Sequence, residues 1–456
     1  MTTIQTINPA TGEELETYQA MTSVEALDIL AATHAAQPSW AATPVAERAR
    51  LAGRLAVVLR AHKATWARLM TLEMGKPVAE SSAEIDKCAW LCEVYAAEAE
   101  GWLADESVTA DGRDHRVVYQ PLGVVLSIMP WNFPFWQALR FGVPTLLAGN
   151  TSVLKHARNV SGCALALEAA FAEAGFPADT FRAVLADHAV TSELLTDDRI
   201  AAVSLTGSTE VGKDVAATAG RHLKPCVLEL GGSDPFIVLA DADLDRAVAG
   251  AVTGRLLNTG QSCIAAKRFL VAEEIHAEFV KRLAAAMSAR RLGDPLDPDT
   301  EVGAIVNERE LNTLQAQIKD ALDQGASLVC GGKSPDGPGF FLQPTVLNGV
   351  KPDMRVWREE VFGPVAPVMA VPDAETALRL ANDTEFGLGG SVWTADEALG
   401  EDLARRLECG SAFVNSIVKS DPRMPFGGVK QSGLGRELAW FGLRAFTNVK
   451  GLNLYD

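Results

Sequence analysis

The chain has 456 residues, of which 48% are hydrophobic, so it is long enough to bury the cores of two or three structural units. Its 41 basic and 58 acidic residues give a formal net charge of −17, which argues against nucleic acid as a partner. The first nine residues lack the basic and apolar regions of a signal peptide, and no apolar run approaches the length of a membrane span, so we expect a soluble, cytoplasmic protein.

The first part of the chain is predicted to be helical. A long amphipathic segment begins at Thr43-Pro44, which supplies a capping residue and a proline in the first turn, and ends at Gly75. A second helix is expected over residues 84–103. Cys88 and Cys92 are four residues apart in its apolar pattern, so core packing is expected for both thiols.

Short apolar runs alternate with helical patterns through the rest of the chain. A first set of expected strands comprises Val117–Tyr119, Val124–Met129, Ser152–Lys155, Phe181–Leu185 and Ala201–Leu205. A second set comprises Asp234–Leu239, Phe269–Val271, Ser327–Val329, Val365–Val371 and Ser411–Asn415. This rhythm predicts the α/β class, with a parallel sheet and crossover helices in the first set and a second α/β domain in the other.

A thiol and a carboxylate stand out as candidate catalytic groups. Cys263 ends the Gly-containing loop Asn258–Cys263, and Glu229 lies 34 positions earlier, just before Leu230 and a glycine pair. A cysteine attacks as its thiolate and needs a nearby group to manage protons, so the two suggest a nucleophile and a base. The alternative is that Cys263 is a small buried apolar residue, the usual place of a free cysteine.

The seven cysteines are odd in number and scattered, and they lack paired metal-ligand spacing. This pattern fits a reducing compartment and predicts neither a disulfide framework nor a metal site.

A nucleotide site is suggested where Ser204–Ser208 ends a strand and opens a helix. The N–H groups at a helix amino terminus can bind a phosphate, although this chain has no Gly-x-Gly-x-x-Gly fingerprint. Glycine and serine at such a turn also serve simply to cap the helix, and this alternative stays open.

Several segments, in this order along essentially the whole chain, resemble the aldehyde dehydrogenase superfamily. They are Met129–Pro134, Leu205–Ser208, Leu228–Gly232, Gly260–Cys263, Glu359–Pro364 and Pro425–Gly433. Within the superfamily, Gly427–Glu437 and Ala265–Arg268 are most similar to the succinate-semialdehyde dehydrogenase branch. The resemblance implies a Rossmann-type cofactor domain, an α/β catalytic domain and a small oligomerisation arm.

By the same resemblance, the cofactor domain would comprise residues 1–103 and 122–231, and the catalytic domain residues 232–430. Residues 104–121 and the tail 431–456 would form the arm. A homodimer or homotetramer is therefore expected.

The resemblance also implies catalytic roles. Cys263 would attack the aldehyde carbon, and the Asn132 amide with the Cys263 N–H would form the oxyanion hole. Glu229 would activate the water that hydrolyses the thioester. Without the resemblance, Asn132 could be a turn residue and Glu229 a partner in a buried salt bridge.

For the cofactor, NADP or NAD, Lys155 resembles the lysine that binds the adenosine ribose and Glu360 the glutamate that binds the nicotinamide ribose. Phe362 would pack beside the nicotinamide. The rest of the cleft would be lined by Trp131, Thr206, Gly207 and Ser208. The alternatives are surface salt bridges for Lys155 and Glu360 and core packing for the two aromatic residues.

Arg158 bears on the choice of cofactor. Many NAD-preferring relatives have a glutamate three residues after the ribose-binding lysine, and this glutamate repels a 2′-phosphate. Arg158 occupies that position and could pair with the phosphate, so NADP is expected to be accepted well. Alternatively, Arg158 points into solvent and both cofactors are used.

Two positions depart from the semialdehyde pattern. Ala265 replaces a second cysteine, so a local disulfide switch is absent, and Leu257 replaces an arginine that binds the substrate carboxylate. Arg140 matches another such arginine, with Ser420 as a secondary candidate; an ordinary ion pair on a helix surface is the alternative for Arg140.

The small aldehyde substrate is thus expected to be succinate semialdehyde or a similar semialdehyde, oxidised to the acid. A CoA-acylating dehydrogenase, oxidation of another small aldehyde and a non-catalytic structural protein are the alternatives. Retention of Glu229 favours hydrolysis, and the intact Cys263, Glu229 and Asn132 disfavour a structural role.

Overall fold

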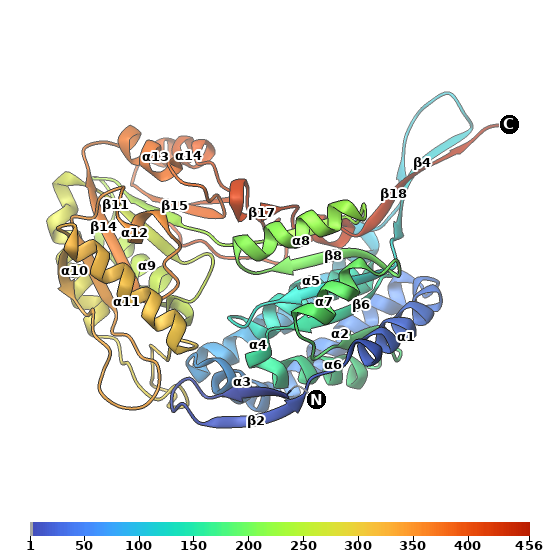
Figure 1. Cartoon of the computed structure of the whole chain (residues 1–456). Coiled ribbons are helices and arrows are strands. Elements are labelled where there is room, and N and C mark those ends of the chain that lie inside the picture. The colour runs from blue at the N-terminus through green and yellow to red at the C-terminus, as the bar shows by residue number, and fades with distance from the viewer. Residues whose placement is uncertain (1–2) are drawn as a thin grey trace.

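The computed structural model describes residues 3–456, which form two open sheets covered by helices and a projecting arm (Figure 1). The first sheet has six strands, in the order β17 (Gly433–Leu434), β9 (Cys226–Glu229), β8 (Ile200–Thr206), β5 (Val124–Met129), β6 (Thr151–His156) and β7 (Phe181–Ala183). All neighbours pair in parallel except β17, which runs antiparallel to β9.

Helices surround this sheet because its central strands are apolar on both faces, as in β5, where five of six residues are buried. These helices are α1 (Ser23–Ala41), α2 (Val45–Ala61), α3 (Lys63–Met74), α4 (Val78–Trp102), α5 (Pro134–Leu147), α6 (Ser161–Ala174), α7 (His188–Thr196) and α8 (Thr209–Arg221). The hairpin of β1 (Thr3–Ile7) and β2 (Glu14–Gln19) precedes α1, and η1 (Arg158–Val160) follows β6.

The second sheet has seven strands, in the order β12 (Ser327–Cys330), β13 (Thr345–Asn348), β14 (Val365–Val371), β11 (Ala266–Ala272), β10 (Asp234–Val238), β15 (Gly389–Trp393) and β16 (Ser411–Val414). Only the edge pair β12–β13 is antiparallel. Its helices are α9 (Leu244–Leu256), α10 (Glu273–Ser288), α11 (Glu308–Asp323), α12 (Arg355–Arg358), α13 (Ala374–Asn382) and α14 (Glu397–Arg406).

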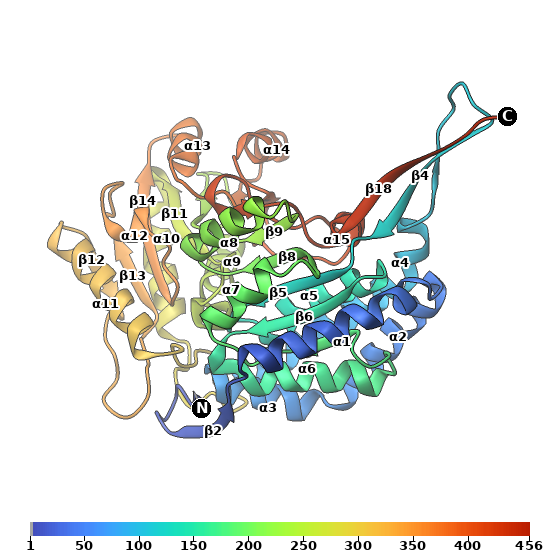
Figure 2. The same cartoon turned by 45° about the vertical axis from the view of Figure 1, so that its right-hand side comes forward.

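The arm is a three-stranded antiparallel sheet in the order β18 (Thr447–Leu454), β4 (Asp114–Pro121) and β3 (Glu106–Ser107). In both views β4 and β18 extend away from the rest of the chain, with the carboxyl terminus near the tip (Figures 1 and 2). Helix α15 (Ala439–Arg444) leads into β18, and the short η2 (Leu257–Gly260) and η3 (Lys430–Ser432) lie in connecting loops.

The order of the first sheet creates a crevice. The chain passes from β5 outward through β6 to β7, and then returns to add β8 and β9 on the other side of β5. At such a switch point the connections leave the carboxyl ends of adjacent strands in opposite directions, which is where ligands bind in open α/β sheets. The segments after β5 and β8 therefore face the same crevice.

The predicted α/β class is confirmed, and Val124–Met129 and Val365–Val371 coincide with β5 and β14. Three predictions from the apolar pattern need correction. Val117–Tyr119 lies in the antiparallel arm and not in a parallel sheet, because β4 pairs with β18 from the far end of the chain. The long first helix is two helices, α2 and α3, separated at His62, and α4 begins at Val78, six residues before the expected start.

The expected boundary between residues 231 and 232 falls between β9 and β10, which belong to different sheets. The division of the chain into domains stays a prediction. None of the helices within residues 3–456 is both long enough and apolar enough to cross a bilayer.

Candidate active site

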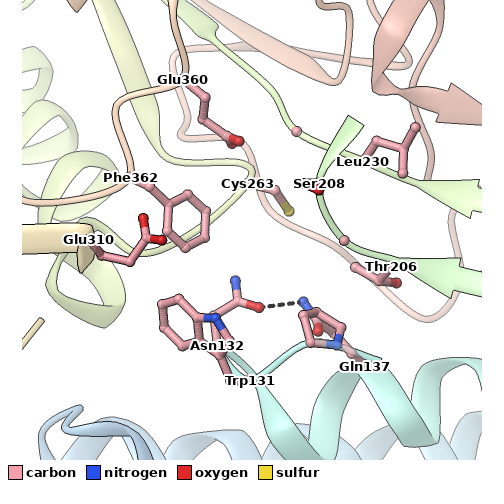
Figure 3. Close-up of a pocket in the computed structure, with 13 residues that line it drawn as sticks. Trp131, Asn132, Gln137, Thr206, Ser208, Leu230, Cys263, Glu310, Glu360 and Phe362 are labelled. Carbon is pink, nitrogen blue, oxygen red and sulfur yellow. Dashed lines mark hydrogen bonds between the residues drawn. The ribbon is translucent and has the colours of Figure 1, made fainter. Parts of the chain in front are cut away.

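A cavity lies at the carboxyl ends of β5 and β8, at the switch point of the first sheet. It is lined by residues from five of the predicted motifs, among them Trp131, Asn132, Thr206, Gly207, Ser208, Leu230, Cys263, Glu360 and Phe362 (Figure 3). Both sheets therefore contribute residues to the wall of this cavity, because Cys263 precedes β11 of the second sheet. Within residues 3–456 there is no cluster of histidine, cysteine, aspartate or glutamate side chains suited to a metal ion.

The loop before Cys263 has an unusual backbone. Asn258 and Thr259 have φ values of 56°, and Gly260 has a φ of 76°, so three successive residues are left-handed. A Cβ on Gly260 would lie 2.5 Å from the carbonyl carbon of Gly363, which leaves glycine as the residue that fits. Such a conformation persists only where the surroundings impose it, as is common at functional sites.

Side-chain hydrogen bonds fix this loop. The Gln261 amide accepts from Val306 N–H at 2.9 Å and donates to the Ala304 carbonyl at 3.1 Å. At the start of the loop, the Glu80 carboxylate accepts from Asn258 N–H at 2.7 Å. The thiol therefore projects from a backbone that is held on both sides.

Asn132 is buried, and its side chain bonds to this loop across 129 residues of sequence. Its Nδ2 donates to the Gln261 carbonyl at 3.0 Å, while its Oδ1 accepts from Gln137 Nε2 at 3.0 Å (Figure 3). The contact with Gln137 fixes which end of the amide is the donor, so the NH₂ group is directed toward the loop that carries Cys263.

A buried ion pair supports the turn that contains Asn132. The Glu84 carboxylate accepts from the N–H groups of Phe135 and Trp136 at 2.9 and 2.8 Å, at the amino terminus of α5. Its other oxygen pairs with Lys76, which also donates to the Asn132 carbonyl at 3.4 Å. A carboxylate at this helix end is favoured by the unpaired N–H groups and the helix dipole.

The Cys263 thiol lies in an environment that disfavours its charge. Burial raises its pKa to about 12, against the positive charges of Lys267 and Arg140, which lower it. Lys267 Nζ donates to the carbonyls of Ser262 and Cys263 at 2.9 and 2.6 Å and pairs with Glu360 at 3.2 Å. Lys267 thus connects the backbone of the candidate nucleophile to a candidate cofactor ligand.

Glu229, at the end of β9, is buried but does not line the cavity around Cys263. Its carboxylate lies against Gly427, where an added Cβ would stand 2.7 Å from Oε1. Within residues 3–456 neither of its oxygens has a hydrogen-bond partner. Burial raises the pKa of Glu229 well above its ordinary value, and the neighbouring Glu437 raises it further, so both favour the neutral form of the carboxyl.

Arg140 lines a second cavity, which also has Cys263 and Gln137 in its wall. Its guanidinium pairs with Glu437, lies 4.7 Å from the Phe426 ring centre and donates to Thr206 Oγ1 at 3.4 Å. Arg140 is 2% exposed, so its ion pair with Glu437 is buried and does not lie on a helix surface.

The other candidate substrate ligand, Ser420, lines the same second cavity and accepts a hydrogen bond from Lys87 at 2.7 Å. Leu257, the position where an arginine was expected by resemblance, lines this cavity as well.

The candidate cofactor residues occupy two places. Trp131 and Phe362 form an edge-to-face pair, with ring centres 5.7 Å apart, in the wall of the first cavity. Ser208 caps α8, and Gly207 N–H donates to the Glu229 carbonyl at 3.0 Å. The Glu360 carboxylate accepts from Gly232 N–H at 3.0 Å, beside the glycine pair.

Lys155 and Arg158 lie at the carboxyl end of β6, outside the cavity that contains Cys263. Lys155 is buried, and burial lowers its pKa, as does the nearby positive charge of Arg158. Arg158 is exposed and donates to the Thr3 carbonyl at 3.1 Å. Within residues 3–456 neither side chain forms a salt bridge, which requires a carboxylate oxygen within 4.0 Å.

Sequence reasoning missed four functional candidates. Gln137 and Lys87 were overlooked because each looks like an ordinary polar residue of a helix, and only the packing of α4 against α5 turns them toward the cavities. Glu310, on α11, lines the first cavity without any sequence signal. Gly231 belongs to a quoted motif, but its closeness to Glu360, 2.6 Å from an added Cβ to Oε2, appears only in the structure.

Comparisons with known proteins agree with this geometry. A model of the "Aldehyde dehydrogenase family" matches residues 1–452. The chain is 47% identical to the probable succinate-semialdehyde dehydrogenase [NADP(+)] of Synechocystis sp., and 48% identical to succinate-semialdehyde dehydrogenase [NADP(+)] 1 of Mycobacterium tuberculosis, over 98% of both chains in each case. The structure is similar to the succinic semialdehyde dehydrogenase of Streptococcus pyogenes in complex with NADP⁺, with a TM-score of 0.97, 36% identity and coverage of 99% of this chain and 100% of that one.

Proposed function

The chain belongs to the aldehyde dehydrogenase family, and from this premise we propose that it oxidises succinate semialdehyde to succinate with NADP⁺ as the hydride acceptor. One observation carries the proposal. Cys263 lies in the wall shared by two cavities, of which one is lined by the candidate cofactor ligands and the other contains the cation Arg140. A nucleophile between two such sites can react with an aldehyde whose other end is anionic.

The residues of the first cavity fit a nicotinamide dinucleotide. Trp131 and Phe362 offer aromatic surface, Glu360 offers a carboxylate to a ribose, and the amino terminus of α8 offers unpaired N–H groups to a phosphate. Lys155 and Arg158 would hold the adenosine end, and the absence of a glutamate at position 158 favours NADP⁺. When bound, NADP⁺ would accept the hydride of the aldehyde.

The chemistry of the protein's own residues follows from their positions. The Cys263 thiol loses its proton to solvent and its sulfur bonds to the aldehyde carbon. The carbonyl oxygen then takes the negative charge and accepts hydrogen bonds from Asn132 Nδ2 and the Cys263 N–H. Loss of hydride leaves a thioester on sulfur. Water then attacks the acyl carbon as Glu229 takes its proton, and the C–S bond breaks with the electron pair on sulfur. Succinate is released, the Cys263 thiolate is regenerated, and Glu229 gives the proton to solvent.

The base role requires Glu229 to turn from Gly427 toward the thioester and to be ionised. Arg140 and Arg436 both lower the pKa of Glu229, so the charged form has two cations to favour it. The retention of this carboxylate supports hydrolysis over transfer of the acyl group to CoA.

The test is an assay of the purified protein with succinate semialdehyde and either cofactor, with and without CoA. We expect reduced cofactor and free succinate in equal amounts, faster with NADP⁺ than with NAD⁺, and no dependence on CoA. A CoA thioester as the main product, or no turnover of succinate semialdehyde where other aldehydes react, would contradict the proposal.

We also propose a homodimer or homotetramer that assembles through the arm, and a cytoplasmic location. The exposed apolar side chains of β18 support the first proposal. The seven free cysteines, all unpaired within residues 3–456, support the second, because free thiols persist in a reducing compartment.

A further inference from the structure

We propose that Lys87 binds the far carboxylate of the substrate and so supplies the cation that Leu257 does not. The inference rests on the proposed function, since it concerns how a semialdehyde is distinguished from a neutral aldehyde. Neither the motifs nor the resemblance pointed to Lys87, which lies on α4 among residues predicted to pack in the core.

The cavity lined by Lys87 is the second one described above, with a volume of about 160 Å³. This is smaller than the roughly 300–1,000 Å³ of pockets for drug-sized ligands, so it suits a short substrate. Most of the surface of its wall is apolar and comes from side chains such as Phe133, Trp136, Leu257 and Ile264, and Cys263 is part of the wall. An anion in such a surrounding needs a charged partner, because burial of an unpaired charge is costly.

Lys87 has the geometry of such a partner. Its Nζ donates to Ser420 Oγ at 2.7 Å and lies 4.2 Å from the centre of the Trp136 ring. Within residues 3–456 Lys87 forms no salt bridge, for which a carboxylate oxygen would have to lie within 4.0 Å of this nitrogen. An ammonium group has three donors, and the described hydrogen bonds use one, so two remain for a ligand.

Arg140 is less available than Lys87 in the same cavity. The Arg140 guanidinium already pairs with the buried Glu437 and donates to Thr206. Release of Arg140 from Glu437 would leave a buried carboxylate without its partner, which is strongly unfavourable. Arg140 therefore adds positive potential, whereas Lys87 and Ser420 can contact the carboxylate directly.

The surroundings of Lys87 also give the proposal a measurable signature. Burial, together with the positive charge of Arg140 on α5, lowers the pKa of Lys87 to about 8, although Cys88 and Glu84 on α4 and Asp421 after β16 act to raise it. Glu80 is the other carboxylate in the wall of this cavity. Lys87 is thus mostly protonated at pH 7 and loses its charge as the pH rises through about 8.

The experiment compares kcat/KM for succinate semialdehyde with kcat/KM for butanal, a neutral aldehyde of the same chain length, as a function of pH. Ionisations of Cys263 and Glu229 affect both substrates and cancel in the ratio. Because kcat/KM reports ionisations of the free enzyme, the wild-type ratio should fall about tenfold per pH unit above about pH 8.

Variants of Lys87 test whether this side chain causes the pH dependence of the ratio. Lys87→Met should lower the ratio at neutral pH by about 10- to 100-fold, as expected for a lost hydrogen bond to a charged group, and should flatten its pH dependence. Lys87→Arg should restore part of the ratio and remove the fall near pH 8, because arginine stays charged. The matched control is Lys281→Met, an exposed lysine of α10, which should leave the ratio unchanged.

Binding of succinate to each variant, measured by calorimetry in the presence of NADP⁺, gives a readout without turnover. Weaker binding by Lys87→Met than by Lys281→Met supports the proposal. Two results would overturn the proposal. One is a wild-type ratio that is independent of pH between 7 and 10, a result that stands even if Lys87→Met folds poorly. The other is equal affinity of Lys87→Met and the wild type for succinate. A wild-type enzyme with no preference for succinate semialdehyde over butanal would instead refute the proposed function.

Discussion

At the scale of single residues, the burial of Cys263 makes its reactivity depend steeply on pH. Because the pKa of this thiol is raised to about 12, its thiolate fraction increases about tenfold per pH unit throughout the neutral and mildly alkaline range. We predict that iodoacetamide alkylates Cys263 of the cofactor-free enzyme about 100-fold faster at about pH 9 than at about pH 7. Mass spectrometry of the Cys263 peptide measures the rate, with Cys263→Ala as the blank.

A rate that levels off between those two pH values would show a thiol with an ordinary pKa. Reaction at Cys226, Cys330 and Cys409, which are partly exposed like Cys263, provides an internal comparison in the same digest.

The carboxylate of Glu229 should govern the second half of the reaction. Glutamine keeps the shape of the side chain but cannot accept a proton, so Glu229→Gln should slow hydrolysis of the thioester by about 10²- to 10⁴-fold. The acyl-enzyme should then accumulate and be visible as a mass increase after rapid mixing with aldehyde and cofactor. Normal steady-state turnover by this variant would exclude the base role.

The adjacent positive charges of Lys155 and Arg158 should select the cofactor. Arg158→Glu places a negative charge where a 2′-phosphate would lie and restores the residue found in many NAD-preferring relatives. We expect the ratio of kcat/KM for NADP⁺ to kcat/KM for NAD⁺ to fall at least tenfold. An unchanged ratio would mean that the hydrogen bond from Arg158 to the Thr3 carbonyl keeps its guanidinium away from the cofactor.

At the scale of elements, the loop between α9 and β11 is the most constrained part of the site. Gly260 and Gly349 have similar left-handed φ values, 76° and 71°, but differ in their surroundings. A Cβ on Gly260 would meet the Gly363 carbonyl group at 2.5 Å, whereas nothing lies within 4 Å of one on Gly349. Substitution of Gly349 therefore tests the effect of backbone strain alone, whereas substitution of Gly260 adds a steric clash.

Gly349→Ala should cost about 1–2 kcal/mol of stability, the strain of a left-handed alanine, with little change in kcat. Gly260→Ala should cost more and should lower kcat more than tenfold, because the loop must shift and carries Cys263 with it. Denaturant unfolding and steady-state kinetics of both variants provide the measurement. Equal effects of the two substitutions would show that the contact with Gly363 is easily relieved.

At the scale of the whole molecule, the arm presents apolar side chains to solvent. Val449 and Leu452 on β18 are 62% and 40% exposed, on a strand at the edge of a three-stranded sheet. An exposed, partly apolar edge strand tends to pair with another chain. Association through this strand would bury the exposed surface.

The double substitution Val449→Lys and Leu452→Lys should therefore lower the mass measured by light scattering to that of a smaller assembly. Val24→Lys on α1, which is 68% exposed, serves as the control and should leave the mass unchanged. A wild-type protein that is already monomeric would refute assembly through the arm.

The sequence by itself determined what depends on neighbouring residues. The apolar runs of β5 and β14 gave those strands their correct bounds, and the helical spacing of Cys88 and Cys92 placed both in the core, where neither is exposed. The motifs predicted the family, and they also brought out Cys263, Asn132 and Glu360, which line one cavity. Such features are visible in sequence because periodicity and turn chemistry are local.

Tertiary structure decided whatever depends on contacts between distant segments. β15 begins with two glycines, a pair that is typical of a turn in sequence. In the structure Gly389 packs against Asp234 of the neighbouring strand β10, so closely that an added Cβ would stand 2.6 Å from Oδ2. The Val117–Tyr119 strand joins the arm because its partner, β18, lies more than 300 residues later. The orientation of Glu229 toward Gly427 and the approach of Lys87 to Ser420 likewise depend on packing between elements, because no local pattern records which way a side chain faces once helices and sheets meet.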